Sequence, residues 1–94
     1  MADIHGGFQN ADDISDPEVL FNFLDAANAS ESIRSCRRRM LDLCPPKPGN
    51  HILDIGCGIG HGAFDLARKV GRTGSVVGVD KSEALIAEAK RRAE

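Results

Sequence analysis

A chain of 94 residues has room for one small domain, and its 41% hydrophobic and 28% charged residues are typical of a globular protein. A formal net charge of −2 provides no positive field to attract nucleic acid or an anionic membrane, so neither is expected as a partner. Four Phe with no Trp or Tyr also argue against a stacking platform for single-stranded nucleic acid. No apolar run is long enough to span a membrane.

The first 15 residues are polar, contain glycine and show no periodicity, which predicts a flexible N-terminal tail over 1–15. A helix is then expected to begin at Asp16-Pro17-Glu18, because Asp16 can cap free N–H groups and proline suits the first helical position. Apolar residues follow at helical spacing and define the expected buried stripe: Val19, Leu20, Phe23, Leu24 and Ala27.

A second helix is expected after Ser30 and before the prolines at 45, 46 and 48. Its apolar stripe contains Ile33, Cys36, Met40 and Leu43. Its other sides carry a basic face, which is expected to be solvated, with contact to an anionic substrate or partner as the alternative: Arg34, Arg37, Arg38 and Arg39. Together the two helices form a predicted helical cap over 16–48.

Three cysteines, Cys36, Cys44 and Cys57, cannot all pair with one another, and their spacing matches no metal-ligand pattern. We therefore predict reduced thiols, a cytoplasmic location and no metal site. Cys36 and Cys44 are expected to be small buried side chains.

Residues 49–94 have the pattern of a βαβ unit followed by a helix. Strands are predicted at His51–Ile55 and Ser75–Val79, with one helix between them and another after Ser82. The apolar run in the first strand suggests burial on both faces. Such a unit has two parallel strands joined by a right-handed crossover, so the fold class is α/β, preceded by two helices.

The glycine loop between the first strand and its helix carries the predicted chemistry. Gly56, Gly58 and Gly60 allow a sharp turn and the close approach of a ligand, and the following helix directs free N–H groups toward the loop. Asp80 ends the next strand twenty residues after Gly60, where an acid can accept both hydroxyls of an adenosine ribose. The combination predicts a nucleotide-like cofactor.

The identity of that cofactor depends on Asp54, directly ahead of the loop. Residues 58–63 fit a dinucleotide-binding pattern, so a fragment of an NAD-binding oxidoreductase is one alternative. A carboxylate beside a pyrophosphate, however, costs about 1–4 kcal/mol at intermediate dielectric. S-adenosylmethionine carries no phosphate and has an ammonium group that suits Asp54, so the residues favour the methyl donor.

Two stretches also resemble the first two motifs of the class I S-adenosylmethionine-dependent methyltransferase family. They are Ile52-Leu53-Asp54-Ile55-Gly56-Cys57-Gly58-Ile59-Gly60 and Val76-Val77-Gly78-Val79-Asp80-Lys81-Ser82. The resemblance covers residues 49–93 and implies a Rossmann-like sheet that transfers a methyl group from S-adenosyl-L-methionine. Residues 49–94 would then be the cofactor-binding βαβα portion of a truncated methyltransferase fold.

The resemblance also implies roles for individual residues. The loop glycines line the methionine moiety, Asp54 serves its ammonium group and Asp80 the ribose. At Lys81 an aliphatic stem packs on the adenine while its charge reaches water. Cys57 packs near the cofactor and is not expected to be a nucleophile. From its position at the start of a helix, His61 is expected to be a polar residue near solvent, with contact to substrate or cofactor as the alternative. The implied cofactor-binding residues are therefore Asp54, Gly56, Cys57, Gly58, Gly60, Asp80 and Lys81.

We expect the chain to be the cofactor-binding part of a methyltransferase that acts on a small molecule. As given, it is expected to lack the acceptor half and to be inactive alone, and no catalytic residue is predicted. Open edges of the two predicted strands favour self-association. A non-catalytic module that binds S-adenosylmethionine or a partner chain is the alternative from another class.

Overall fold

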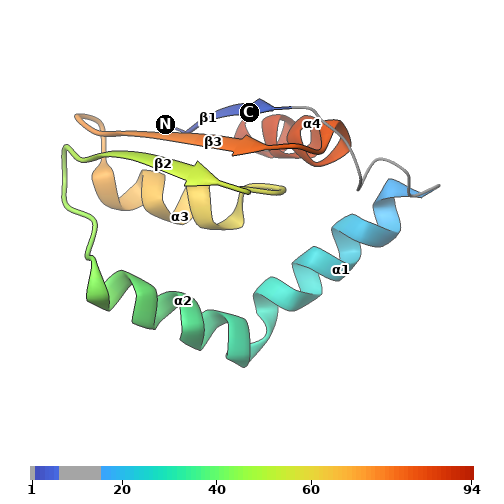
Figure 1. Cartoon of the computed structure of the whole chain (residues 1–94), viewed down its shortest axis with the longest axis horizontal. Helices are drawn as coiled ribbons and strands as arrows, with labels where there is room; N and C mark the ends of the chain where they lie inside the picture. Colours follow the sequence, from blue (N-terminus) through green and yellow to red (C-terminus); the bar gives the residue numbers. More distant parts are fainter. Residues whose placement is uncertain (1, 7–15) are drawn as a thin grey trace.

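The computed structural model describes residues 2–6 and 16–94 and has an α/β architecture (Figure 1). The elements in chain order are β1 (Ala2–Gly6), α1 (Pro17–Ala29), α2 (Glu31–Leu43), β2 (His51–Ile55), α3 (His61–Val70), β3 (Ser75–Asp80) and α4 (Glu83–Ala93). The sheet is parallel with strand order β1-β3-β2, and α1 and α2 form a V-shaped hairpin on the side of α3 (Figure 1). Within the described ranges, no helix has both the length and the apolar character needed to cross a bilayer.

The main core lies between the sheet and helices α3 and α4, which cover the same face. Val76 of β3 is fully buried and clusters with Ala63 and Val70 of α3 and with Ile86 and Ala89 of α4. A parallel crossover with its helices on one face is the arrangement expected of the βαβ pattern. The predicted α/β fold class is confirmed.

The structure has three strands where the sequence predicts two. β1 pairs in parallel with β3, with Ile4 opposite Gly78, and Ile4 is buried. A Cβ atom at Gly78 would lie 3.0 Å from Ile4 Cδ1, so the glycine leaves the space that the isoleucine fills. The expectation of a flexible tail is therefore wrong for residues 2–6, because the open edge of β3 pairs with them. The rest of the predicted tail, 7–15, lies outside the described residues.

The ends of the hairpin helices follow the predicted caps. The Glu18 N–H donates to Asp16 Oδ1 (3.1 Å), and the Ile33 N–H donates to Ser30 Oγ (3.4 Å). The predicted buried stripe of α1 is wrong in part, because Phe21 is buried while Val19 and Phe23 are exposed. Helix α1 packs on the domain through Phe21, with Leu20 and Leu24 beside it.

Helix α2 has no buried residue, and both Cys36 and Cys44 are exposed. The expectation that these cysteines are buried is therefore wrong. Cys36 is exposed because the apolar stripe of α2 faces a cavity and does not pack against the core. Cys44 is exposed because it lies at the end of α2, outside both the core and the cavity lining.

The predicted burial of β2 on both faces is also wrong. Ile52 packs against the main core, whereas Leu53 and Ile55 on the opposite face are 59% and 77% exposed. Helices α3 and α4 both cover the face of Val76, so the other face of β2 lacks a covering helix in the described part of the chain.

Candidate functional site

The glycine loop is held at the carboxyl ends of β2 and β3 by backbone hydrogen bonds. The N–H groups of Gly56 and Cys57 both donate to the carbonyl oxygen of Val79, at 2.7 and 2.9 Å. The Gly58 N–H donates to Asp80 Oδ2 at 2.9 Å. The loop is therefore fastened to the end of the neighbouring strand, and its shape depends on Asp80.

Glycine is required at the end of this loop for two separate reasons. Gly60 has a φ of 100°, in the left-handed region that side chains rarely adopt. A Cβ atom there would also lie 2.7 Å from the ring of Phe64. Helix α3 begins at the next residue, His61, and no side chain caps its amino end. Its first N–H groups thus remain directed at the loop.

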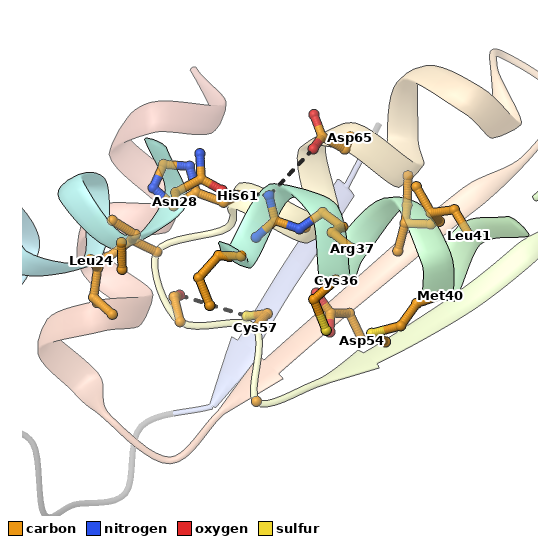
Figure 2. A pocket seen from close by; sticks show the side chains of 17 residues that line it. Leu24, Asn28, Cys36, Arg37, Met40, Leu41, Asp54, Cys57, His61 and Asp65 are labelled. Atoms are coloured by element: carbon orange, nitrogen blue, oxygen red, sulfur yellow. Dashed lines mark hydrogen bonds and ion pairs between the residues drawn. The ribbon is translucent and has the colours of Figure 1, made fainter. Parts of the chain in front are cut away.

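A cavity of about 490 Å³ lies between this loop and the α1–α2 hairpin (Figure 2). The hairpin contributes mainly apolar side chains, namely Leu24, Ile33, Cys36, Met40 and Leu41. The polar side chains come from both walls and are Asn28, Arg37, Asp54, His61 and Asp65. Apolar walls with a few converging polar groups are typical of small-molecule sites.

Asp54 is the carboxylate of the cavity that the described residues leave open to a ligand. It is half-buried beside the amino end of α3, where a Cβ atom at Gly62 would lie 3.6 Å from Asp54 Oδ2. No residue in the described ranges donates a hydrogen bond to its carboxylate. Burial raises the pKa of Asp54, the charge of Arg37 opposes that rise, and the charge of Asp80 adds to it. A cationic group in the cavity would supply the missing partner.

Residues 46–94, which contain both the loop and Asp80, match the sequence model of a family described as "Methyltransferase domain". The chain belongs to the class I S-adenosylmethionine-dependent methyltransferase family. The match covers β2, α3, β3 and α4, and leaves the hairpin outside.

Two methyltransferases and one uncharacterized protein are similar to stretches of 56 to 73 residues of this chain. A nocamycin O-methyltransferase from Saccharothrix syringae is 45% identical over 60 residues, covering 64% of this chain and 21% of the relative. An aklanonic acid methyltransferase from Streptomyces sp. (strain C5) is 45% identical over 56 residues, covering 60% and 26%. An uncharacterized 37.1 kDa protein in transposon TN4556 of Streptomyces fradiae is 37% identical over 73 residues, covering 78% and 21%. The chain thus spans about a quarter of the length of these relatives.

The structure brings four of the predicted site residues of this methyltransferase-family chain to the cavity wall: Asp54, Gly56, Cys57 and Gly58. Gly60, Asp80 and Lys81 lie outside the lining, at the end of the loop and at the end of β3. Asp80 is half-buried, and both of its carboxylate oxygens accept backbone N–H groups, Oδ1 that of Ser82 at 2.9 Å and Oδ2 that of Gly58. Lys81 is exposed.

Cys57 lies in the wall of the cavity with the properties of a packing residue. It is buried, and its Sγ would lie 2.9 Å from a Cβ atom at Gly78. Burial, together with the charges of Asp54 and Asp80, raises the pKa of its thiol to about 11. A thiol of this kind is protonated at neutral pH and is a poor nucleophile.

An ion-pair network fastens α1 to the site. His61 Nε2 lies 2.9 Å from Asp25 Oδ1, and Arg92 donates to both carboxylate oxygens of Asp25, at 2.7 and 2.9 Å. These bonds from Arg92, followed by the contact with His61, lower the pKa of Asp25 to about 2. His61 is half-buried, lines the cavity and pairs with Asp25 of α1, 36 residues away in the sequence.

Sequence reasoning missed Asp25 and Ile59, and it placed Arg37 on a solvated face. Ile59, in the middle of the loop, packs with Phe21 of α1 and Leu85 of α4 in a second apolar cluster. An isoleucine inside a glycine loop was the available signal, because an apolar residue there needs a partner to cover it.

Proposed function

We propose that this chain binds S-adenosylmethionine in the cavity and forms the cofactor-binding part of a methyltransferase that acts on a small molecule. The observation that carries the proposal is the half-buried Asp54 carboxylate, which lines the cavity without a hydrogen-bond donor among the described residues. The cofactor has an α-ammonium group, and a carboxylate beside a glycine loop suits it. The cavity volume of about 490 Å³ is within the range of small-molecule sites.

The remaining predicted residues fit this cofactor with defined roles. Gly56, Gly58 and Cys57 give the methionine moiety a wall without bulky side chains, and Gly60 ends that wall at α3. Asp80 can still serve the ribose, because each carboxylate oxygen accepts more than one hydrogen bond and each receives one from the backbone. Lys81 is exposed, and its role in this proposal is to pack its aliphatic stem on the adenine.

When bound, the cofactor supplies a methyl group that its sulfonium already activates. The part of the protein described here contributes binding and alignment, which is the main requirement of such a displacement. Asp54 fixes the amino acid end, and the apolar walls of the hairpin shield that end from water. Asp80 fixes the sugar end, beyond the lining of the cavity. None of these residues has to donate or remove a proton.

A small-molecule acceptor is supported by the names of the relatives, which include a nocamycin O-methyltransferase and an aklanonic acid methyltransferase. We further propose a cytoplasmic protein, supported by three cysteines that are all unpaired. Self-association is a third proposal. The predicted open edge of β3 is occupied by β1, so the proposal now rests on β2, which is an edge strand among the described residues and exposes Leu53 and Ile55.

Titration with two ligands tests the proposed cofactor. S-adenosylhomocysteine, which lacks the reactive methyl group, is expected to shift the amide NMR signals of Gly56, Gly58 and Asp80. NAD is expected to leave them unchanged, because its pyrophosphate meets the Asp54 carboxylate. Larger shifts with NAD would support the oxidoreductase alternative, and no shift with either ligand would contradict cofactor binding altogether.

A further inference from the structure

Helix α2 carries four arginines, and one of them differs from the others in where it lies. Arg37 lines the cavity together with Asp54, whereas Arg34, Arg38 and Arg39 are absent from its lining (Figure 2). The side chain of Arg37 is 28% exposed, compared with 58% for Arg38, which pairs with Glu31. Arg34, Arg37 and Arg38 together line a second hollow between α2 and α3, so among these arginines Arg37 alone reaches both hollows. A partly buried guanidinium on the wall of an apolar cavity calls for an anionic partner.

The contacts of Arg37 leave most of its donors unused. Among residues 2–6 and 16–94, its polar partners are Asn28 and Asp65, and both contact the same nitrogen, Nη1. The Asp65 contact is 3.7 Å long, and Asp65 also accepts a 2.7 Å bond from Arg68. Nε and Nη2 thus remain available, and a guanidinium fork with two free donors suits a carboxylate.

Opposite charges therefore face one cavity without being paired to each other. The distance between Arg37 and Asp54 exceeds that of an ion pair, yet the charge of Arg37 is felt at the Asp54 carboxylate. A ligand that carries a positive and a negative group on one carbon atom, as an amino acid does, would satisfy both residues at once. A dinucleotide would satisfy Arg37 alone, and its phosphates would be repelled by Asp54.

We propose that Arg37 binds the α-carboxylate of the amino acid moiety of the cofactor, while Asp54 binds its α-ammonium group. The proposal rests on the proposed function, and it extends the site from the glycine loop to the second helix of the hairpin. Arg37 then makes the hairpin part of the cofactor site. Asn28 and Asp65 hold Nη1 from α1 and α3, and so they orient the guanidinium toward the ligand.

The proposal is tested by comparing two ligands that differ in the amino acid group alone. S-adenosylhomocysteine carries that group, and 5′-methylthioadenosine has the same nucleoside and thioether without it. Calorimetry on the 94-residue chain is expected to show that Arg37→Gln weakens S-adenosylhomocysteine binding roughly 10- to 150-fold, the effect of losing charge-assisted hydrogen bonds. Binding of 5′-methylthioadenosine is expected to be unchanged.

Two further variants separate ligand binding from a structural role. Arg37→Lys keeps the charge without the fork and is expected to lie between wild type and Arg37→Gln, while Arg38→Gln is the control and leaves both affinities unchanged. An equal loss for both ligands in the Arg37 variants would overturn the proposal, because it would mean that Arg37 only supports the hairpin. Unchanged S-adenosylhomocysteine binding would overturn it as well. Failure of the wild-type chain to bind either ligand would instead reject the proposed function, and this inference with it.

Discussion

Two carboxylates flank the glycine loop, and they differ in what they contact. Both oxygens of Asp80 accept backbone N–H groups, so its charge is used to hold the loop in shape. Asp54 receives no such bond from the described residues and is half-buried, which raises its pKa. Asp80 therefore stabilises the fold, whereas the half-buried charge of Asp54 destabilises it. A charged side chain that lowers the stability of the fold is a common feature of binding sites.

Asp54→Asn is therefore expected to stabilise the unliganded chain at neutral pH. A raised carboxyl pKa means that the contribution of Asp54 to stability is fully present below its unfolded value of 3.8 and is lost as the pH rises through the folded value. The variant is expected to have the higher urea midpoint at pH 7, and the difference is expected to vanish near pH 3.

The same substitution removes the proposed partner of the ligand ammonium group. It is expected to weaken S-adenosylhomocysteine binding by about 1.5–3 kcal/mol, or roughly 10- to 150-fold. Calorimetry on both proteins checks this, with wild-type chain at the same pH as reference. A less stable variant, or one with undiminished affinity, would show that Asp54 is a structural carboxylate.

The residues of the loop were predictable because their signals are local. Gly56, Gly58 and Gly60 stand within five residues of each other, and Asp54 and Asp80 end or precede recognisable segments. Arg37 and Asp25 were not predictable, because their roles depend on contacts with α3 and α4 across long stretches of sequence. An apolar stripe on a helix also has the same sequence pattern whether it faces a core or a cavity. The exposure of Cys36 could therefore not be predicted.

At the scale of elements, the hairpin is joined to the domain by a small area. Phe21 packs against Ile59 and Leu85, and Asp25 pairs with His61 and Arg92. The sequence could not identify the packed side of α1, because apolar residues occupy 19–21 and 23–24 and so surround much of the helix. Which of these apolar side chains is buried depends on the position of Ile59 in the loop, and the tertiary structure sets that position.

Two phenylalanines of α1 provide a matched test of how the hairpin is held. Phe21 is 9% exposed and Phe23 is 66% exposed. Phe21→Ala is expected to lower the free energy of unfolding by about 3 kcal/mol, the lower end for a buried phenylalanine, because the cluster is small. Phe23→Ala is expected to change it by less than about 0.5 kcal/mol.

Urea denaturation followed by circular dichroism measures both values. Equal effects of the two substitutions would mean that α1 does not pack through Phe21. If Phe21→Ala also weakens S-adenosylhomocysteine binding while Phe23→Ala does not, the docked hairpin contributes to the site, as expected from the position of Arg37 in its second helix.

For the whole molecule, the order of the elements from residue 16 onward was predictable, and the sheet was not. Caps, prolines and glycines mark element ends locally, as Asp16 and Ser30 show. The pairing of β1 with β3 joins residues more than seventy positions apart, and residues 2–6 have no periodicity that would predict a strand. The same limit applies to burial: the apolar run of β2 shows that its side chains suit a buried sheet, but not which face the helices cover.

The exposed face of the sheet leads to a prediction about association. Leu53 and Ile55 project from β2 on the side opposite α3 and α4, and contiguous exposed apolar side chains of this kind favour contact with another protein surface. Sedimentation of the wild-type chain is expected to show dimers or larger species that increase with concentration. Ile55→Lys is expected to shift the equilibrium toward monomer by roughly tenfold or more, because a lysine must be desolvated where an isoleucine was buried.

Leu43→Lys serves as the control for that experiment, since Leu43 is 87% exposed at the end of α2, away from the sheet. It makes the same change of charge and polarity and is expected to leave association unchanged. A wild-type chain that is monomeric at all concentrations would contradict the prediction. Dissociation by Leu43→Lys and not by Ile55→Lys would assign association to the hairpin, whose own exposed side chains, Val19 and Phe23 among them, would then form the contact.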